Sequence, residues 1–161
     1  MITHPFIDLS LLILLIALLI MVIVRLRNKT LALWNEVTRL ELTFHKKLFE
    51  SLHLFLSHKN QFEHHAHYHY YDILSKYKDE SAKALSLADR QDIFKALQAL
   101  YLCIDEGSHP AQITLKNQFD ELQSCRLKYN SKVLYYNHFI QSFPMNLLAK
   151  RMHFDVKKYF G

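Results

Sequence analysis

A run of sixteen residues near the N-terminus, residues 9–24, constrains this chain most, because its only polar member is Ser10. Phe6 and Ile7 extend the run toward the roughly 20 residues with which a helix crosses a bilayer. A cleaved signal peptide would begin with a basic segment and end at a small-residue cleavage site, whereas residues 1–8 contain no Lys or Arg. We therefore predict a transmembrane helix over residues 9–24, behind a short extracytoplasmic tail formed by residues 1–8.

Basic residues follow this run directly, at Arg25, Arg27 and Lys29. Basic flanks of a membrane helix stay in the cytoplasm, which predicts that the N-terminus lies outside and residues 25–161 lie inside. No second apolar run of comparable length occurs. The sequence therefore predicts a single-pass protein of a cytoplasmic membrane.

The composition favours one helical domain behind the anchor. Half of the 161 residues are hydrophobic, so the chain can bury a core, but it contains only two Gly and three Pro. Sandwiches and barrels need turn residues at regular short intervals, and phosphate-binding loops need several glycines. We expect long helices and no nucleotide-binding loop.

The helices are expected where apolar residues recur at steps of three and four. The membrane helix can continue as one rod to a break at residues 57–60, with helices over residues 61–79 and 86–106 and a loop at residues 107–110. The apolar stripe of the rod comprises Leu33, Val37, Leu40, Phe44, Leu48, Leu52 and Phe55. The stripe of the third helix comprises Ile93, Phe94, Leu97, Leu100, Tyr101 and Ile104.

The last helix has the most regular seam, which Pro144 should end. The seam comprises Leu115, Phe119, Leu122, Arg126, Tyr129, Val133, Tyr136, Ile140 and Phe143. Such seams pack against antiparallel neighbours in bundles. The predicted fold is all-α: an N-terminal transmembrane helix continuous with or followed by an antiparallel three- to four-helix bundle with long helices. An extended trimeric coiled coil is the rival, and the turn at residues 107–110 favours the bundle.

The sequence shows no arrangement of residues typical of catalysis. Its carboxylates are scattered, and Cys103 and Cys125 are isolated, so they are interpreted as small core residues. The lysines are dispersed instead of forming one patch, which argues against nucleic acid as a partner. We expect no enzymatic activity, no cofactor and no small-molecule substrate.

One histidine-rich tract could bind a metal. His64, His65, His67 and His69 lie within six positions, and on a helix His65 and His69 share a face with Asp72. Clustered histidines could also respond to pH near 6. The simpler interpretation is a solvated polar helix, because four histidines so closely spaced point all round a helix and only some can converge.

The C-terminal third carries short motifs that together resemble the LemA family. They comprise Arg126, Tyr129 and Asn130, then Tyr136 and Asn137, then Phe143, Pro144, Asn146, Leu147, Leu148 and Ala149, and finally Phe154, Tyr159 and Phe160. The resemblance covers residues 93–161. Behind the anchor the chain lacks the paired arginines and the Ile-Pro-Asn-Leu stretch usual in that family, so it is identified as a divergent member. The resemblance implies a membrane-anchored helical bundle of the bacterial envelope without established enzymatic activity, and one specialised relative is associated with magnetosomes.

These motif residues also have a structural interpretation that needs no ligand. The hydroxyls of Tyr129 and Tyr136 require polar partners when their rings are buried, and Asn130 and Asn137 could bond across helices. Arg126 should meet a carboxylate or the carbonyls at a helix end. Asn146 could hold the turn after Pro144 through its side chain.

The preferred function is that of a scaffold or tether in the bacterial inner membrane, either on its own or as a subunit of a larger membrane complex. Its expected partners are the lipid bilayer and a protein in the same membrane, or a second copy of the chain. The surplus of aromatic residues over what a small bundle can bury motivates an exposed contact surface. The alternative is a metal- or pH-responsive module that uses the tract from His64 to His69.

Overall fold

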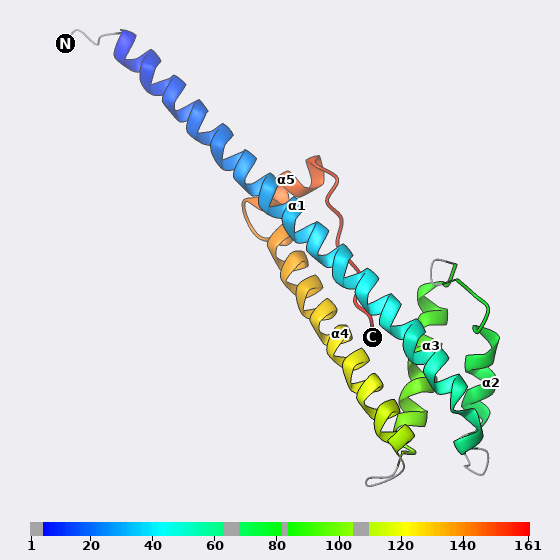
Figure 1. The fold of residues 1–161 in the computed structure, drawn as a ribbon. Coiled ribbons are helices and arrows are strands. Elements are labelled where there is room, and N and C mark those ends of the chain that lie inside the picture. Colours follow the sequence, from blue (N-terminus) through cyan, green and yellow to red (C-terminus); the bar gives the residue numbers. More distant parts are fainter. Residues whose placement is uncertain (1–4, 63–67, 82–83, 105–109) are drawn as a thin grey trace.

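A computed structural model describes residues 5–62, 68–81, 84–104 and 110–161 as an all-α protein (Figure 1). The elements of this part of the chain are α1 (Pro5–Ser57), a short 3-10 helix (Lys59–Phe62), α2 (His69–Lys76), α3 (Leu87–Tyr101), α4 (Pro110–Gln141) and α5 (Met145–Arg151). The predicted fold class is confirmed.

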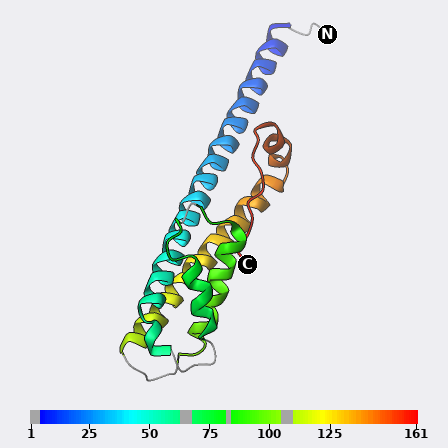
Figure 2. The same ribbon diagram turned by 90° about the vertical axis from the view of Figure 1, so that its right-hand side faces the viewer.

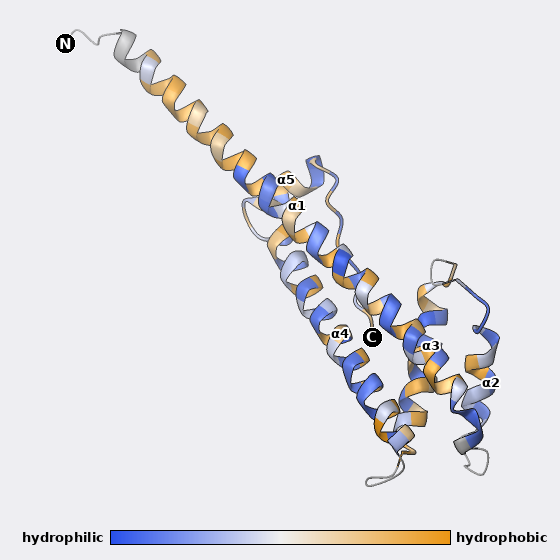
Figure 3. Ribbon diagram, in the orientation of Figure 1, coloured by the Kyte–Doolittle hydropathy of each residue, from blue (hydrophilic) through white to orange (hydrophobic). Residues whose placement is uncertain are grey.

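Helix α1 is one uninterrupted rod of 53 residues. At 1.5 Å per residue it is about 80 Å long, and no Pro or Gly breaks it after its first residue. Its N-terminal part has a mean hydropathy of 3.1 and none of it is buried, which makes it a candidate membrane span (Figure 3). The rest of α1 packs against the bundle and ends at Ser57, within the predicted break.

The helices α1, α2, α3 and α4 run alternately down and up, so chain neighbours are antiparallel (Figures 1 and 2). Only α1 and α4 are long, and α2 and α3 cover the end of the bundle far from the N-terminus. The prediction of a helix over residues 61–79 was wrong in extent: α2 has 8 residues, and residues 63–67 lie outside the described part of the chain. Helix α3 begins at Leu87 because Ser86 and Asp89 form a capping box, and it ends at Tyr101, five residues before the predicted end at residue 106.

The core follows the predicted stripes closely. All seven predicted positions of α1 belong to the core or pack against it. In α3 and α4, six predicted positions are fully buried: Ile93, Leu97, Leu115, Leu122, Val133 and Tyr136. Phe143 was wrongly placed on the seam. Helix α4 ends at Gln141, two residues earlier, so the side chain of Phe143 points away from the bundle and is 79% exposed.

Two elements at the C-terminus were not predicted. Helix α5 follows Pro144 and lies across α1 and α4 at the end of the bundle nearest the apolar part of α1 (Figure 1). The chain then turns at His153, whose φ is 57°, and Phe154 N donates to Ala149 O at 3.0 Å. Residues 152–161, which we name the strap, return along the α1–α4 pair without forming a helix or a strand.

Candidate functional site

The strap lies on α1 and α4 and is held there by side chains that α4 supplies at heptad spacing. Asn130 and Asn137 are seven residues apart, and so are Tyr129 and Tyr136. Seven residues correspond to almost two helical turns, so all four side chains leave the same side of α4. This local geometry turns one face of the helix into a row of polar anchors.

Each asparagine pairs with one strap residue through both the NH2 group and the oxygen of its side-chain amide. Asn137 Nδ2 donates to Lys157 O at 2.8 Å, and Lys157 N donates to Asn137 Oδ1 at 2.8 Å. Asn130 makes the same pair with Phe160, at 2.7 and 2.9 Å. An amide side chain therefore replaces the neighbouring strand that would satisfy this extended backbone in a sheet.

The two tyrosine hydroxyls add a parallel row of bonds. Tyr129 Oη donates to Lys158 O at 2.8 Å and Tyr136 Oη donates to Asp155 O at 3.0 Å. Burial raises the pKa of both Tyr129 and Tyr136 to about 12, so both hydroxyls stay protonated and can donate across the physiological pH range.

The spacing of the anchors matches the spacing of the strap residues. Lys157 and Phe160 are three residues apart, as are Asp155 and Lys158, whereas their partners on α4 are seven apart. Seven helical residues rise about 10.5 Å and three extended residues span about 10 Å. Side chains seven residues apart on the helix therefore bond to residues three apart on the extended chain. The two asparagines and the two tyrosines both follow this spacing.

Side chains fix the strap at both ends of this row. The ring of Phe160 is 2% exposed and packs edge-on against Phe44, with ring centroids 4.5 Å apart, and against Phe94 at 5.6 Å. Lys157 Nζ lies 3.3 Å from Glu41 Oε2 and 4.2 Å from the centroid of the Trp34 ring. The strap therefore bridges α1, α3 and α4.

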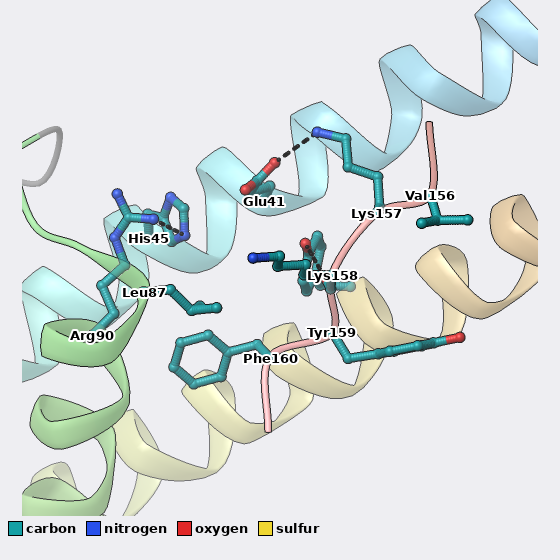
Figure 4. A pocket seen from close by; sticks show the side chains of 10 residues that line it. Glu41, His45, Leu87, Arg90, Val156, Lys157, Lys158, Tyr159 and Phe160 are labelled. Atoms are coloured by element: carbon teal, nitrogen blue, oxygen red, sulfur yellow. Dashed lines mark hydrogen bonds and ion pairs between the residues drawn. The ribbon is translucent and has the colours of Figure 1, made fainter. Parts of the chain in front are cut away.

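A cavity of about 280 Å³ remains between the strap, α1 and α3 (Figure 4). Its polar lining includes Glu41, His45, Arg90 and Lys158. Arg90 Nη1 lies 3.1 Å from His45 Nε2, which is consistent with a neutral imidazole accepting the bond. Burial and the adjacent Arg90 charge lower the pKa of His45, which favours this neutral form. Glu41, His45 and Arg90 are thus engaged with one another's elements or with the strap through Lys157.

The structure changes the interpretation of two kinds of motif residue. Asn130 and Asn137 were expected to bond across helices, but they bond to the strap, because the α4 face on which they lie is covered by extended chain. Arg126 was expected to meet a carboxylate or helix-end carbonyls. Its guanidinium instead lies 4.8 Å from the centroid of the Phe94 ring, and its Nε is buried without a hydrogen-bond partner.

The motif from Phe143 to Leu147 forms the connection between α4 and α5. The Phe143–Pro144 peptide is cis, and Asn146 closes the turn through its backbone N–H, which donates to Ser142 O at 2.8 Å, instead of through its side chain. Leu147 is 66% exposed. Cys103 and Cys125 are free thiols and both are half-buried. Cys125 packs against the core, as predicted, whereas Cys103 does not belong to it.

The structure places only part of the proposed metal site. His64, His65 and His67 lie outside the described residues. His69 begins α2 and Asp72 lies in its first turn. Within the described ranges no three His, Cys, Asp or Glu side chains come together as a metal site. The metal hypothesis therefore stays a prediction for the tract as a whole.

Aromatic side chains are mostly used inside the protein. Among the described residues, those left exposed are Tyr135, Phe143 and Tyr159. Most of the aromatic surplus that the composition indicated is absorbed by the core and by the strap, so few aromatic side chains remain for the predicted exposed contact surface. The repeated Tyr-Asn pairs were the sequence signal for the strap. Two asparagines seven residues apart lie on one side of a helix, and a solvent-exposed helix does not require amide side chains at that spacing.

Comparison with known proteins gives one match. The model of the LemA family matches residues 107–161, which contain α4, α5 and the strap. The resemblance predicted from the C-terminal motifs is confirmed for this part of the chain, although the match does not extend to residues 93–106. No curated protein and no solved structure matches the chain.

Replacing Asn130 and Asn137 together by Ala should release the strap. Each change removes two hydrogen bonds from half-buried backbone and should cost about 1–3 kcal/mol of unfolding free energy. Hydrogen exchange of the detergent-solubilised full chain should show loss of protection at the Lys157 and Phe160 amides. Asn117→Ala, an exposed asparagine of the same helix, is the control and should leave both amides protected. Unchanged exchange in the double variant would contradict the role of the two asparagines and leave the tyrosine bonds, the Lys157–Glu41 pair and Phe160 as the contacts that hold the strap.

Acidification should weaken the contact between α1 and α3 through His45. Because its folded pKa lies below 6.5, the unfolded chain binds a proton more readily, and stability falls as pH drops through 6.5. His45→Gln should reduce this pH dependence of the urea midpoint. His53→Gln, an exposed histidine of the same helix, should retain it. Equal slopes for the wild type and His45→Gln would contradict the role assigned to this imidazole.

Proposed function

We propose, from the match of residues 107–161 to the LemA family and from the course of α1, that this chain is a membrane-anchored interaction protein of the bacterial envelope. Its role is that of a scaffold or tether, without catalytic activity. The bilayer is one partner, and a protein of the same membrane, or a second copy, is the other. The observation that carries this proposal is the continuity of α1 from the apolar segment into the core.

The continuity of α1 makes membrane anchoring part of the fold. The apolar stretch and the core stripe belong to one helix of 53 residues, with no Pro or Gly between them. A helix without such a break bends only gently, so the orientation of the bundle follows the orientation of the membrane segment. A protein built in this way presents its surfaces at a defined height above the bilayer.

The charges after the apolar stretch support one orientation. Arg25, Arg27 and Lys29 are exposed and follow the apolar run directly, whereas the N-terminal side carries Asp8. The positive-inside rule places the bundle in the cytoplasm. The membrane is then the bacterial cytoplasmic membrane, with the N-terminus outside.

A narrow apolar face on α4 fits a protein partner. Leu127 and Leu134 are 61% and 60% exposed and lie seven residues apart, hence on one side of the helix. A shallow groove beside Leu127 is lined by Leu40 and edged by the Lys132–Glu36 ion pair, whose atoms lie 3.1 Å apart. Anchoring in one membrane raises the effective concentration of neighbours, so a small contact of this kind can suffice.

The contacts around the cavity support a structural role over a catalytic one. Glu41 is paired with Lys157, His45 with Arg90, and the hydroxyl of Tyr129 with the strap. These groups hold elements together instead of facing a reacting atom. Catalysis requires a general acid, base or nucleophile aimed at a substrate position.

Arginine substitutions in the apolar stretch should abolish membrane integration. Leu15→Arg together with Leu19→Arg should cost about 5–7 kcal/mol of insertion free energy and move the protein into the alkaline carbonate extract. Leu42→Arg, at an exposed position of the same helix, should leave it in the membrane pellet. In the wild type, added protease should cleave the bundle in inverted vesicles but not in intact spheroplasts. The opposite pattern would overturn the orientation.

A photoreactive amino acid at Leu127 or Leu134 should crosslink to a protein in intact membranes. The same amino acid at Leu102, which is 75% exposed at the far end of the bundle, is the matched control. A discrete adduct formed from α4 positions and absent at Leu102 supports the proposed face, and mass spectrometry then separates a second copy from another protein. No adduct at either leucine would overturn it.

A further inference from the structure

A second surface with apolar and basic residues lies close to the apolar stretch of α1 and is separate from it. It consists of residues 143–151, which include the exposed Phe143 and helix α5. This inference rests on the proposed anchoring, because only the anchor defines where the bilayer lies.

The position of α5 along α1 brings it to the membrane boundary. Thr30 Oγ1 donates to Leu26 O at 2.8 Å and lies 3.5 Å from Met145 Sδ, and both Thr30 and Met145 are buried. Thr30 lies six residues after Val24, the end of the apolar run, which is about 9 Å along the helix axis. The polar headgroup layer on each side of a bilayer is about 5–7 Å thick. Since a helix is about 10 Å wide, the membrane side of α5 reaches this layer.

The orientation of α5 exposes its apolar residues at this level. Figure 1 shows α5 lying across the long helices, not along them. Met145 and Ala149 face the bundle and are 1% and 4% exposed, whereas Phe143 and Leu147, four residues apart, are 79% and 66% exposed. Single exposed apolar residues are common on protein surfaces. Here Phe143 lies in the turn before α5 and Leu147 lies within α5, so two exposed apolar side chains stand close together beside the candidate membrane span. Together they can form the apolar half of an interfacial segment.

The charges around α5 complement anionic lipid. Lys150 and Arg151 end the helix and are exposed, and Arg25, Arg27 and Lys29 lie on the facing stretch of α1. Residues 9–35 and 139–154 contain no Asp or Glu at all. The end of the bundle that faces the membrane is therefore uniformly basic, although acidic residues are frequent elsewhere in the domain.

We propose that residues 143–151 form an interfacial contact with the inner leaflet of the membrane. Phe143 and Leu147 insert at the boundary of headgroups and acyl chains, and Lys150 and Arg151 bind the phosphates of anionic lipids. The bundle is then held at two points, α1 and α5, which prevents its rotation about the anchor and fixes which side faces a partner.

The contact can be tested with an environment-sensitive fluorophore on the full chain. Cys103 and Cys125 are first changed to Ser, and the dye is attached in turn through Leu147→Cys and Leu102→Cys. Both positions are strongly exposed, so labelling should not disturb the fold. The protein is reconstituted into vesicles of phosphatidylcholine mixed with phosphatidylglycerol. Dye at residue 147 should be protected from aqueous iodide and quenched by spin-labelled lipid, whereas dye at residue 102 should show the reverse.

The charge requirement is tested by Lys150→Gln with Arg151→Gln in the same label background. Each lost cation should weaken the contact about fivefold in the anionic vesicles, because a basic residue near such a surface contributes about 1 kcal/mol. Vesicles of phosphatidylcholine alone should show little difference between the variant and its parent. Equal lipid quenching of the parent and the variant in anionic vesicles would overturn the lipid-phosphate part of the proposal.

Two further outcomes separate this inference from the anchoring on which it rests. If the protein floats with the vesicles and resists carbonate but residue 147 is as accessible to iodide as residue 102, the inference is wrong and the anchor stands. If the protein does not float with the vesicles, the anchor itself is wrong. Protection at residue 147 that disappears when protein is diluted with lipid would instead identify a second copy as the occupant and also overturn the proposal.

Discussion

The packing of α4 against α1 is the interaction on which the other parts of this structure depend. Phe44 stands at its centre, since it is fully buried, lies parallel to the Tyr129 ring with centroids 6.4 Å apart and touches Phe160 of the strap. Antiparallel helices with apolar residues at heptad spacing bury most of their apolar area in one seam. The short helices α2 and α3 complete the core only at the far end, so near the apolar stretch of α1 other parts of the chain cover the α1–α4 pair.

The strap and α5 supply that cover, and they do so by different physical means. Helix α5 buries Met145 and Ala149 against the long helices, which is ordinary hydrophobic packing. The strap is held largely through its backbone, by two asparagines and two tyrosines. Because an unsatisfied backbone group is costly when water is excluded, this arrangement gives the strap one register instead of a range of sliding positions.

The arrangement of these parts relates the fold to the proposed tether. Helix α4 ends, α5 lies and the strap begins beside the part of α1 that follows its apolar stretch, so three connected segments meet there (Figure 1). Lys157 of the strap joins Glu41 and Trp34 of α1 across more than a hundred residues of sequence. The strap therefore ties the C-terminal end of the chain to the long N-terminal helix.

Local patterns in the sequence determined the helices, the apolar anchor and the seam, since the positions of Val37, Leu122 and Val133 follow from a period that each segment carries by itself. The effect of Pro144 also located the end of α4 to within a few residues. The positions of Phe143, Arg126 and the strap were decided by tertiary structure alone. The sequence of an extended segment has no periodicity from which its packing partner could be predicted. A side chain at the edge of a seam can face another helix, solvent or a returning chain. Asn130 and Asn137 can both bond to the returning chain because seven helical residues and three extended residues have nearly the same length. This match has an effect only when the fold brings the two segments side by side.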